Sequence, residues 1–421
     1  MYVQEIDIHH LRVFESASLK LQYPGRSDVG PLHLPNINLL LGNNGAGKTT
    51  VLKALALATL APVIDKSGFL PYHLIRNGQT KAWIQSRVLL HPQDTGKGAG
   101  SSSTLKTEIV REGDLEILTT MSGATSGPWS GMFDNSSPAF LVVGYGATRR
   151  VQDAGSYNPD DQAKRRFLRY QRVAGLFEAH IALTPLTAWL PIAETANPGL
   201  YQQVHALINE LLPEGAHFSS RRETMGASLG DYLYEVNGIE VPFGALSDGF
   251  RAYIGWITDL LYHVSAGGLS STKLVDSRGI VLVDEIDLNL HPEWQRNVCS
   301  TISTVLPNLQ FVFSTHSPIV AGSLEKENIF VMEAEDSGAS TVSQYGEKIY
   351  GMDAEQILLS SYFNLETTRA PGFVDELQEL SRQVGKGKPE IALAIMQKLA
   401  GQDVSKPQKK AKVVKKTRRR A

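Results

Sequence analysis

A glycine-rich run near the N-terminal end has the spacing of a phosphate-binding loop. It follows the pattern G-x-x-x-x-G-K-T, and its members are Gly42, Asn43, Asn44, Gly45, Ala46, Gly47, Lys48 and Thr49. An apolar stretch at 37–41 ends where the run begins, and a helix-forming stretch opens with Thr50. Strand, glycine loop and helix N-terminus together direct backbone N–H groups at a polyphosphate. The run therefore predicts an ATP site, with Lys48 on the β- and γ-phosphates and the Thr49 hydroxyl on Mg²⁺.

Two adjacent carboxylates follow a second apolar stretch, at residues 279–283. In open α/β sheets, ligands bind at the edge formed by the carboxyl ends of the buried strands. Asp284 is suited to hold Mg²⁺ through a water molecule, and Glu285, one residue on, points to the opposite side. Glu285 is then free to polarise an attacking water as a general base. We therefore expect Thr49 and Asp284 at the metal and Glu285 at the chemistry.

A third apolar stretch, at 309–313, leads into a polar run that contains His316. A histidine at such a strand end can hydrogen-bond the γ-phosphate and the catalytic water, so we expect a catalytic role for it. An L-S-x-G-x-R run at 246–251 lies between the phosphate-binding loop and the acids. Ser247 and the Gly249 backbone, at a predicted helix N-terminus, would bind an anion supplied from outside the subunit. Taken alone, this run also fits a capping serine followed by a glycine turn.

The composition is that of a globular protein, with 421 residues, of which 42% are hydrophobic and 20% charged. No apolar run approaches the ~18 residues of a membrane span. The N-terminal residues lack the profile of a signal peptide. The single cysteine, Cys299, excludes an internal disulfide and a multi-cysteine zinc site, and we expect a buried, inert thiol. These features predict a cytoplasmic protein.

The charge is distributed unevenly along the chain. The segment Lys406–Ala421 carries six lysines, three arginines and no acid, a charge of +9. Because the whole chain has a net charge of −2, the residues before this segment carry −11. A solvated, disordered extension is one interpretation. The other is a sequence-independent contact with nucleic-acid phosphates, because basic residues without interleaved aromatics suit backbone contact and not base stacking.

Alternating apolar and polar residues predict a hairpin at 2–23 that turns at 11–14, and further antiparallel strands at 82–90, 105–112 and 114–121. A Gly/Ser-rich loop is expected at 95–104. The segment 160–212 is predicted to be helical, with breaks at Pro185, Pro191 and Pro198. Asn237–Gly238 predicts a tight hairpin within 232–241. Helices and strands then alternate over 250–332, which indicates parallel βαβ units, and 353–400 is expected to be helical.

The order of these motifs resembles that of the ABC-type ATPases. Phosphate-binding loop, L-S-x-G-x-R signature, Asp-Glu pair and switch histidine follow one another over residues 37–318. Two details resemble the soluble branch that contains SMC-like, RecF-like and OLD-like ATPases. An L-R-x-F turn at 11–14 precedes the loop, and the acid pair continues as D-E-x-x-x-x-L-H-P at 284–292. The latter run is similar to that of stand-alone bacterial AAA-family ATPases, several of which accompany nucleases or other effectors in phage defence, as in Septu-type and retron-linked systems.

The resemblance implies an α/β fold, a P-loop NTPase of ABC-ATPase type with a mixed sheet core, an antiparallel β subdomain, a helical subdomain and a helical C-terminal extension. It places the ATPase head at 1–335, with the β subdomain inserted at about 60–140 and the helical subdomain at about 155–265. The extension would cover 336–400 and a basic disordered tail 401–421. The further nucleotide-binding residues that it implies are Arg12, Thr50, Ser247 and Gly249.

The same resemblance implies a mechanism. ATP bound to one subunit's loop would contact Ser247 and Gly249 of a second subunit, so that two nucleotides are buried in a head-to-tail homodimer. Hydrolysis would loosen the dimer, and a partner effector such as a nuclease, or a nucleic acid bound by the basic tail, would respond to the change. No membrane partner is expected.

The sequence departs from the pattern of these families in more than one respect. It shows no heptad series long enough for a coiled-coil arm, which argues against a true SMC or DNA-tethering protein. The usual lid glutamine is not evident, and we place the lid at 145–149. The acidic run 333–336 is interpreted as a surface turn rather than as a nuclease metal site. Two other functions stay open, a membrane transporter's ATP-binding subunit and a DNA repair or recombination loader of RecF type. Co-purification with an integral membrane protein would favour the first, and DNA-stimulated hydrolysis the second.

Overall fold

The computed structural model describes residues 1–95, 101–121, 132–134, 137, 139–151, 168–225, 228–267 and 273–385. Contacts divide the chain into two compact units, Met1–Asn364 and Leu365–Ala421. The described part of the second unit contains the helix α11 (Pro371–Gly385). All other elements named below belong to the first unit.

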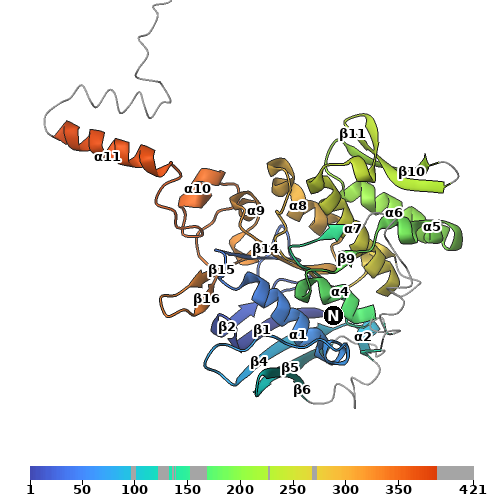
Figure 1. Cartoon of the computed structure of the whole chain (residues 1–421), viewed down its shortest axis with the longest axis horizontal. Coiled ribbons are helices and arrows are strands. Elements are labelled where there is room, and N and C mark those ends of the chain that lie inside the picture. The colour runs from blue at the N-terminus through green and yellow to red at the C-terminus, as the bar shows by residue number, and fades with distance from the viewer. Residues whose placement is uncertain are drawn as a thin grey trace, which may run out of the picture. The chain divides into compact units, whose positions relative to one another are not determined.

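A six-stranded mixed sheet forms the centre of the first unit, in the order β16-β15-β3-β14-β13-β7. Figure 1 labels three of its strands, β14, β15 and β16. Five of these strands are parallel, and only β16 runs against its neighbour. Their bounds are β3 (Ile37–Gly42), β7 (Val142–Tyr145), β13 (Gly279–Val283), β14 (Leu309–Thr315), β15 (Ile329–Ala334) and β16 (Ser340–Ser343). The carboxyl ends of β3, β13 and β14 therefore lie at one edge, where a doubly wound sheet binds its ligand.

The two faces of this sheet are buried in different ways. On one face, alternate residues such as Leu40, Leu282 and Val312 belong to a core with α1 (Lys48–Lys66) and a five-stranded antiparallel sheet. Figure 1 labels α1 and the strands of this sheet. That sheet has the order β2-β1-β4-β5-β6, with β1 (Tyr2–Leu11), β2 (Phe14–Lys20), β4 (Lys81–Leu90), β5 (Ser101–Glu112) and β6 (Leu115–Met121). The period of two along each central strand dictates this division of side chains between the faces.

The opposite face packs on helices that come later in the chain. Leu41 and Phe313 belong to a core with α6 (Pro198–Leu211), α7 (Asp248–Gly267) and α8 (Pro292–Val305). A three-stranded sheet extends this side, with β10 (Ala216–Met225), β11 (Ser228–Val236) and β12 (Ile239–Pro242). The remaining elements are α2 (Pro92–Thr95), β8 (Arg150–Val151), α4 (Leu168–Phe177), β9 (Ala182–Leu183), α5 (Leu186–Ala196), α9 (Pro318–Gly322) and α10 (Ala354–Leu359).

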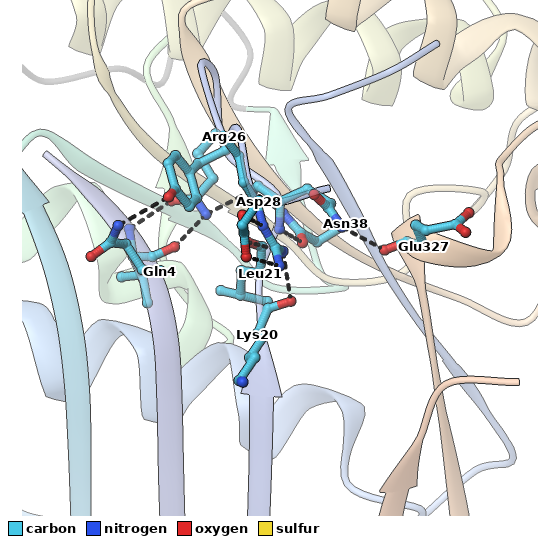
Figure 2. A network of polar contacts seen from close by, with 11 residues as sticks. Gln4, Lys20, Leu21, Arg26, Asp28, Asn38 and Glu327 are labelled. Carbon is cyan, nitrogen blue, oxygen red and sulfur yellow. Dashed lines mark hydrogen bonds and ion pairs between the residues drawn. The ribbon is translucent and has the colours of Figure 1, made fainter. Parts of the chain in front are cut away.

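Two buried amide side chains fix the N-terminal hairpin to the central strands. Asn38 of β3 accepts from the Gln22 N–H at 2.6 Å and donates to the Gln22 carbonyl at 2.9 Å (Figure 2). Gln310 of β14 does the same for Val3, accepting from its N–H at 2.8 Å and donating to its carbonyl at 2.7 Å. A buried backbone group left without such a partner costs about 1–3 kcal/mol. The two amides thereby hold the hairpin against β3, which leads to the phosphate-binding loop, and β14, which leads to His316.

A surface ion pair beside this network closes the turn that follows β2. Arg26 pairs with Asp28 at 2.6 Å and donates to the Leu21 carbonyl at 3.0 Å (Figure 2). Because the Asp28 side chain is 67% exposed, we assign this pair to local order of the turn and not to fold stability.

Most of the expected elements are confirmed. The hairpin at 2–23 becomes β1 and β2, and Asn237–Gly238 forms the turn of β11 and β12 with positive φ angles of 53° and 81°. The alternation of helices and strands from α7 to β15 is also as predicted.

Several local predictions are wrong. Pro191 does not break a helix but lies inside α5. Residues 101–104, expected in a loop, form the start of β5 because they pair with β4.

The antiparallel strands do not form a separate insertion, since β1 and β2 supply two of the five strands of their sheet. The structure divides the chain into its two units after Asn364, and the end of the ATPase head at residue 335 stays a prediction. The segment 353–400 is not one helical stretch, because residues 360–370 separate α10 from α11 and 386–400 lie outside the described residues. The tail 401–421 lies outside them as well.

Candidate nucleotide site

The phosphate-binding loop joins β3 to α1 and lies on the turn between β1 and β2. Gly47 caps α1 with φ 104°, in the left-handed region that favours glycine. A Cβ at this position would lie 2.5 Å from the Phe14 ring and 2.8 Å from Val13. The L-R-x-F turn therefore supports the loop directly, and the same turn carries the exposed Arg12, whose N–H donates to the Leu74 carbonyl at 2.8 Å. Arg12 thus lies in the turn next to the loop.

The loop threonine and the first strand-end acid are in direct contact. Thr49 Oγ1 donates to Asp284 Oδ2 at 2.7 Å. The other carboxylate oxygen accepts from Ser314 Oγ at 2.5 Å, and Asp284 is 5% exposed. Hydroxyl and carboxylate oxygens are the ligands that Mg²⁺ prefers. The oxygens of Thr49 and Asp284 are therefore of the kind that would hold Mg²⁺.

Lys48 and His316 meet across the same edge of the sheet. The Lys48 ammonium donates to the carbonyls of Gly42 and Asn43 at 2.8 and 3.2 Å, and lies 2.7 Å from His316 Nε2. Burial lowers the pKa of Lys48 from its ordinary value, against the opposing effect of Asp284 and neighbouring carboxylates. Burial also lowers the pKa of His316, and the Lys48 ammonium lowers it further.

Glu285 has an unusual backbone conformation. Its φ is +50°, in the left-handed region where a non-glycine residue is strained. Three contacts hold this strand end. The Glu285 N–H donates to Ser314 Oγ at 2.8 Å, and Arg149 donates to the carbonyls of Asp284 at 2.5 Å and of Glu285 at 2.9 Å. The neighbouring Asp287 accepts from Thr315 Oγ1 at 2.5 Å.

Arg149 is the site residue that sequence reasoning missed. The sequence predicts the lid at 145–149 but not which of its side chains contacts Mg²⁺ or water. The buried guanidinium has its pKa lowered to about 10 by burial, opposed by Asp284, Glu285 and Asp287. It contacts peptide carbonyls, so it orients the acids through the main chain. The available signal was the position of this basic residue, four residues after the end of the buried strand β7. That signal becomes informative only once β7 is known to lie beside β13.

The signature run occupies the start of α7. Ser247 is exposed, and its hydroxyl accepts from the Phe250 N–H at 3.4 Å, a weak cap. A Cβ at Gly249 would lie 2.0 Å from the carbonyl oxygen of Asn289, so only glycine fits against the segment that follows Glu285. Hydrogen bonds join Lys48 to His316 and Thr49 to Asp284, and among the described residues Ser247 is bonded to neither pair.

Two further features bear on the class of protein. Residues 333–336 are exposed at the end of β15 and in the turn before β16, and the described residues contain no cluster of three or more metal-ligating side chains. No helix in the described ranges is long and apolar enough to cross a bilayer.

A mixed sheet with a phosphate-binding loop after one of its parallel strands and carboxylates after another is typical of a P-loop ATPase. Two sequence families match parts of this chain. Residues 5–76 match the AAA domain, and residues 189–321 match the family described as AAA domain, putative AbiEii toxin, Type IV TA system. These matches and the relatives' names support an ATPase.

The chain is related to ATPases of Septu and retron systems, as its motifs predict. It is 24% identical to the Septu protein PtuA of Bacillus mycoides over 87% of this chain and 45% of that protein. It is 22% identical to the Retron Vc95 probable ATPase of Vibrio cholerae, over 80% of this chain and 75% of that protein. The chain thus spans less than half the length of that Septu protein. A solved SMC head bound to the C-terminal winged-helix domain of ScpA aligns with 82% of this chain, at 14% identity and a TM-score of 0.49.

Proposed function

We propose that this chain hydrolyses ATP with Mg²⁺ at the site formed by 42–49, Asp284, Glu285 and His316. The observation that carries the proposal is the 2.7 Å contact between the Thr49 hydroxyl and the Asp284 carboxylate. These two residues are far apart in the sequence, and their oxygens meet beside a loop that can hold a polyphosphate. When bound there, Mg²⁺ would neutralise charge on the transferred phosphate.

Each side chain has a role that follows from its position. Lys48 directs its ammonium at two carbonyl oxygens of the loop, and it would donate to the β- and γ-phosphates in their place. Glu285 would accept a proton from the attacking water. His316, released from Lys48, would hydrogen-bond the γ-phosphate and that water. Arg149 would keep the two acids in place by holding their carbonyl groups.

The second part of the proposal is a dimerisation switch. Ser247 is exposed at the start of α7, so its hydroxyl and the N–H groups behind it are accessible to a phosphate held by another subunit. Two such contacts would close a twofold homodimer around two ATP molecules, and hydrolysis would open it. The names of the Septu and retron relatives support a role in bacterial defence, in which a partner effector such as a nuclease responds to the state of the dimer.

One observation favours a second candidate, a DNA repair ATPase of RecF type. The chain is 27% identical to the DNA replication and repair protein RecF of Xanthomonas axonopodis over 59% of this chain and 60% of that protein. A RecF-like loader should hydrolyse ATP faster with duplex DNA, whereas an ATPase that gates an effector need not respond to it.

The experiment measures phosphate release by the purified chain with Mg²⁺ or with EDTA, and with or without duplex DNA. In parallel, the molecular mass of the chain in solution is measured in the presence and in the absence of ATP. We expect Mg²⁺-dependent release and an ATP-dependent dimer. Absence of both would overturn the proposal, while strong stimulation by DNA would favour the second candidate.

A further inference from the structure

A buried carboxylate in α7 is hydrogen-bonded to the strand beside the acids. Asp259, 3% exposed, accepts from the Tyr145 hydroxyl at 2.8 Å and from the Thr184 N–H at 2.7 Å. His263 Nε2 lies 3.3 Å from the same carboxylate, one helical turn further on. Burial alone would raise the pKa of Asp259, but the charge and hydrogen bond of His263 and the other donors hold it below its ordinary value. Asp259 is therefore an ionised acceptor at the end of β7.

Tyr145 connects this carboxylate to the nucleotide site. Its carbonyl accepts from the Asp284 N–H at 2.8 Å, and its hydroxyl is bonded to Asp259. Four residues on, Arg149 donates to the Asp284 carbonyl. The segment 145–149 therefore binds both the N–H and the C=O of Asp284, through Tyr145 and Arg149 respectively. The segment is itself bonded to α7 through Asp259.

The N-terminal end of α7 contacts the acids' segment at a second place. Gly249 packs so closely on the Asn289 carbonyl that a Cβ would lie 2.0 Å from it. Asn289 lies four residues after Glu285 and has a positive φ of 62°. The helix that begins beside Ser247 thus contacts both flanks of the acid pair, at Asn289 and, three turns later, at Tyr145.

We infer that Tyr145 and Asp259 are positioning residues, which couple the helix headed by Ser247 to the geometry of Asp284 and Glu285 in the same subunit. The inference rests on the proposed function. A phosphate of the other subunit at Ser247 would bias the position of α7, and the bond between Asp259 and Tyr145 transmits that position to the strand end that carries the acids. A misplacement of about 1 Å at a reacting group can reduce a rate about 100-fold, so a small shift is sufficient.

The test variant is Tyr145→Phe. This change removes the hydroxyl but keeps the ring, whose centroid lies 5.8 Å from the centroid of the Trp256 ring. The matched control is Tyr253→Phe, because Tyr253 is also a buried tyrosine, and its hydroxyl donates from α7 to the Leu211 carbonyl at 2.8 Å, away from the acids. Each change removes one buried hydroxyl bond and should cost similar stability, so any difference between them reports the connection to the acids.

Two measurements are made on both variants and on the wild-type chain. In steady-state kinetics we expect Tyr145→Phe to lower kcat about tenfold with KM for ATP unchanged, and Tyr253→Phe to leave both near wild type. In amide hydrogen exchange we expect faster exchange of residues 284–290 in Tyr145→Phe and not in Tyr253→Phe. Equal kcat and equal exchange in the two variants would reduce the Tyr145 bond to ordinary packing and overturn the inference.

The exchange measurement separates the two possible failures. If the wild-type chain releases no phosphate, the proposed function fails, and the exchange of 284–290 still decides whether Tyr145 holds the acids. Asp259→Asn provides a second variant. This change keeps the size of the side chain but turns one acceptor into a donor that faces other donors. The amides of residues 284–290 should therefore exchange as fast in this variant as in Tyr145→Phe. Wild-type exchange in Asp259→Asn would also contradict the inference.

Discussion

Lys48 Nζ lies 2.7 Å from His316 Nε2. An ammonium group carries only donors, so the imidazole nitrogen must be the acceptor. His316 is therefore neutral in this arrangement, with its proton on Nδ1. The lowered pKa of His316, caused first by burial and then by Lys48, agrees with this assignment.

This contact predicts a specific dependence of stability on pH. Because the folded-state pKa of His316 lies below its ordinary value of 6.5, the unfolded chain takes up the proton first as the pH falls. The free energy of unfolding should therefore fall from about pH 6.5 downwards, as far as His316 contributes. His316→Gln keeps an acceptor but does not titrate, so its loss of thermal stability between pH 7 and pH 5 should be smaller. The measurement is the unfolding temperature against pH, with the exposed His33→Gln as control. Parallel curves for wild type and His316→Gln would contradict the assignment.

Glu285→Gln should separate ATP binding from hydrolysis. The amide keeps the shape of the side chain but cannot accept the proton of water, so turnover should fall about 100-fold or more while ATP affinity stays the same. The same variant should accumulate as a dimer in ATP. Phosphate release, calorimetry and sedimentation measure the three effects. Glu112→Gln, an exposed change at the end of β5, is the control. Wild-type turnover in Glu285→Gln would show that another group is the base.

The sequence predicts the parts of this site that are written in local patterns. Asp284 follows an apolar strand, and the glycine loop stands between a strand and a helix, so their contact follows from the general architecture of such sheets. Arg149 and the bond between Tyr145 and Asp259 could not be predicted in this way. These contacts depend on β7 lying next to β13 and on which turn of α7 faces β7. The residues near Arg149, Tyr145 and Asp259 in the sequence indicate neither of these two arrangements. The position of Pro191 could not be predicted either, because proline usually breaks a helix interior, yet Pro191 lies in the middle of α5.

Lys48→Ala should abolish nucleotide binding rather than only slow the chemistry. The triphosphate would lose its principal cation at a partly buried site, where charge-assisted hydrogen bonds are strong. Calorimetry with ATP measures the effect. Lys66→Ala, an exposed lysine at the other end of α1, should bind like wild type. Unaltered ATP affinity in Lys48→Ala would remove the phosphate-binding loop from the proposed function.

Ser247→Arg should act on the partner's nucleotide and not on its own. The exposed serine heads α7, so the larger cation should leave ATP binding by a monomer intact but block dimerisation and hydrolysis. Ser18→Arg, on an exposed position of β2, is the control. Mixing Ser247→Arg with Lys48→Ala protein should restore at most one working site per dimer. Absence of any recovery, with heterodimers shown to form, would contradict independent composite sites.

The basic segment Lys406–Arg420 lies outside the described residues, and its two interpretations differ in their salt dependence. If all nine positive charges contacted duplex phosphates, the logarithm of the DNA affinity would fall with the logarithm of salt concentration at a slope of about −8. Fewer contacts would give a proportionally smaller slope. The test compares DNA binding over a salt titration by the full chain, by a chain lacking 406–421, and by a chain of full length with the nine cations changed to glutamine. We expect both altered chains to lose affinity and slope together while retaining ATP hydrolysis, because the contact needs the charges and not the length. Equal affinity and slope in all three would leave this segment a solvated extension.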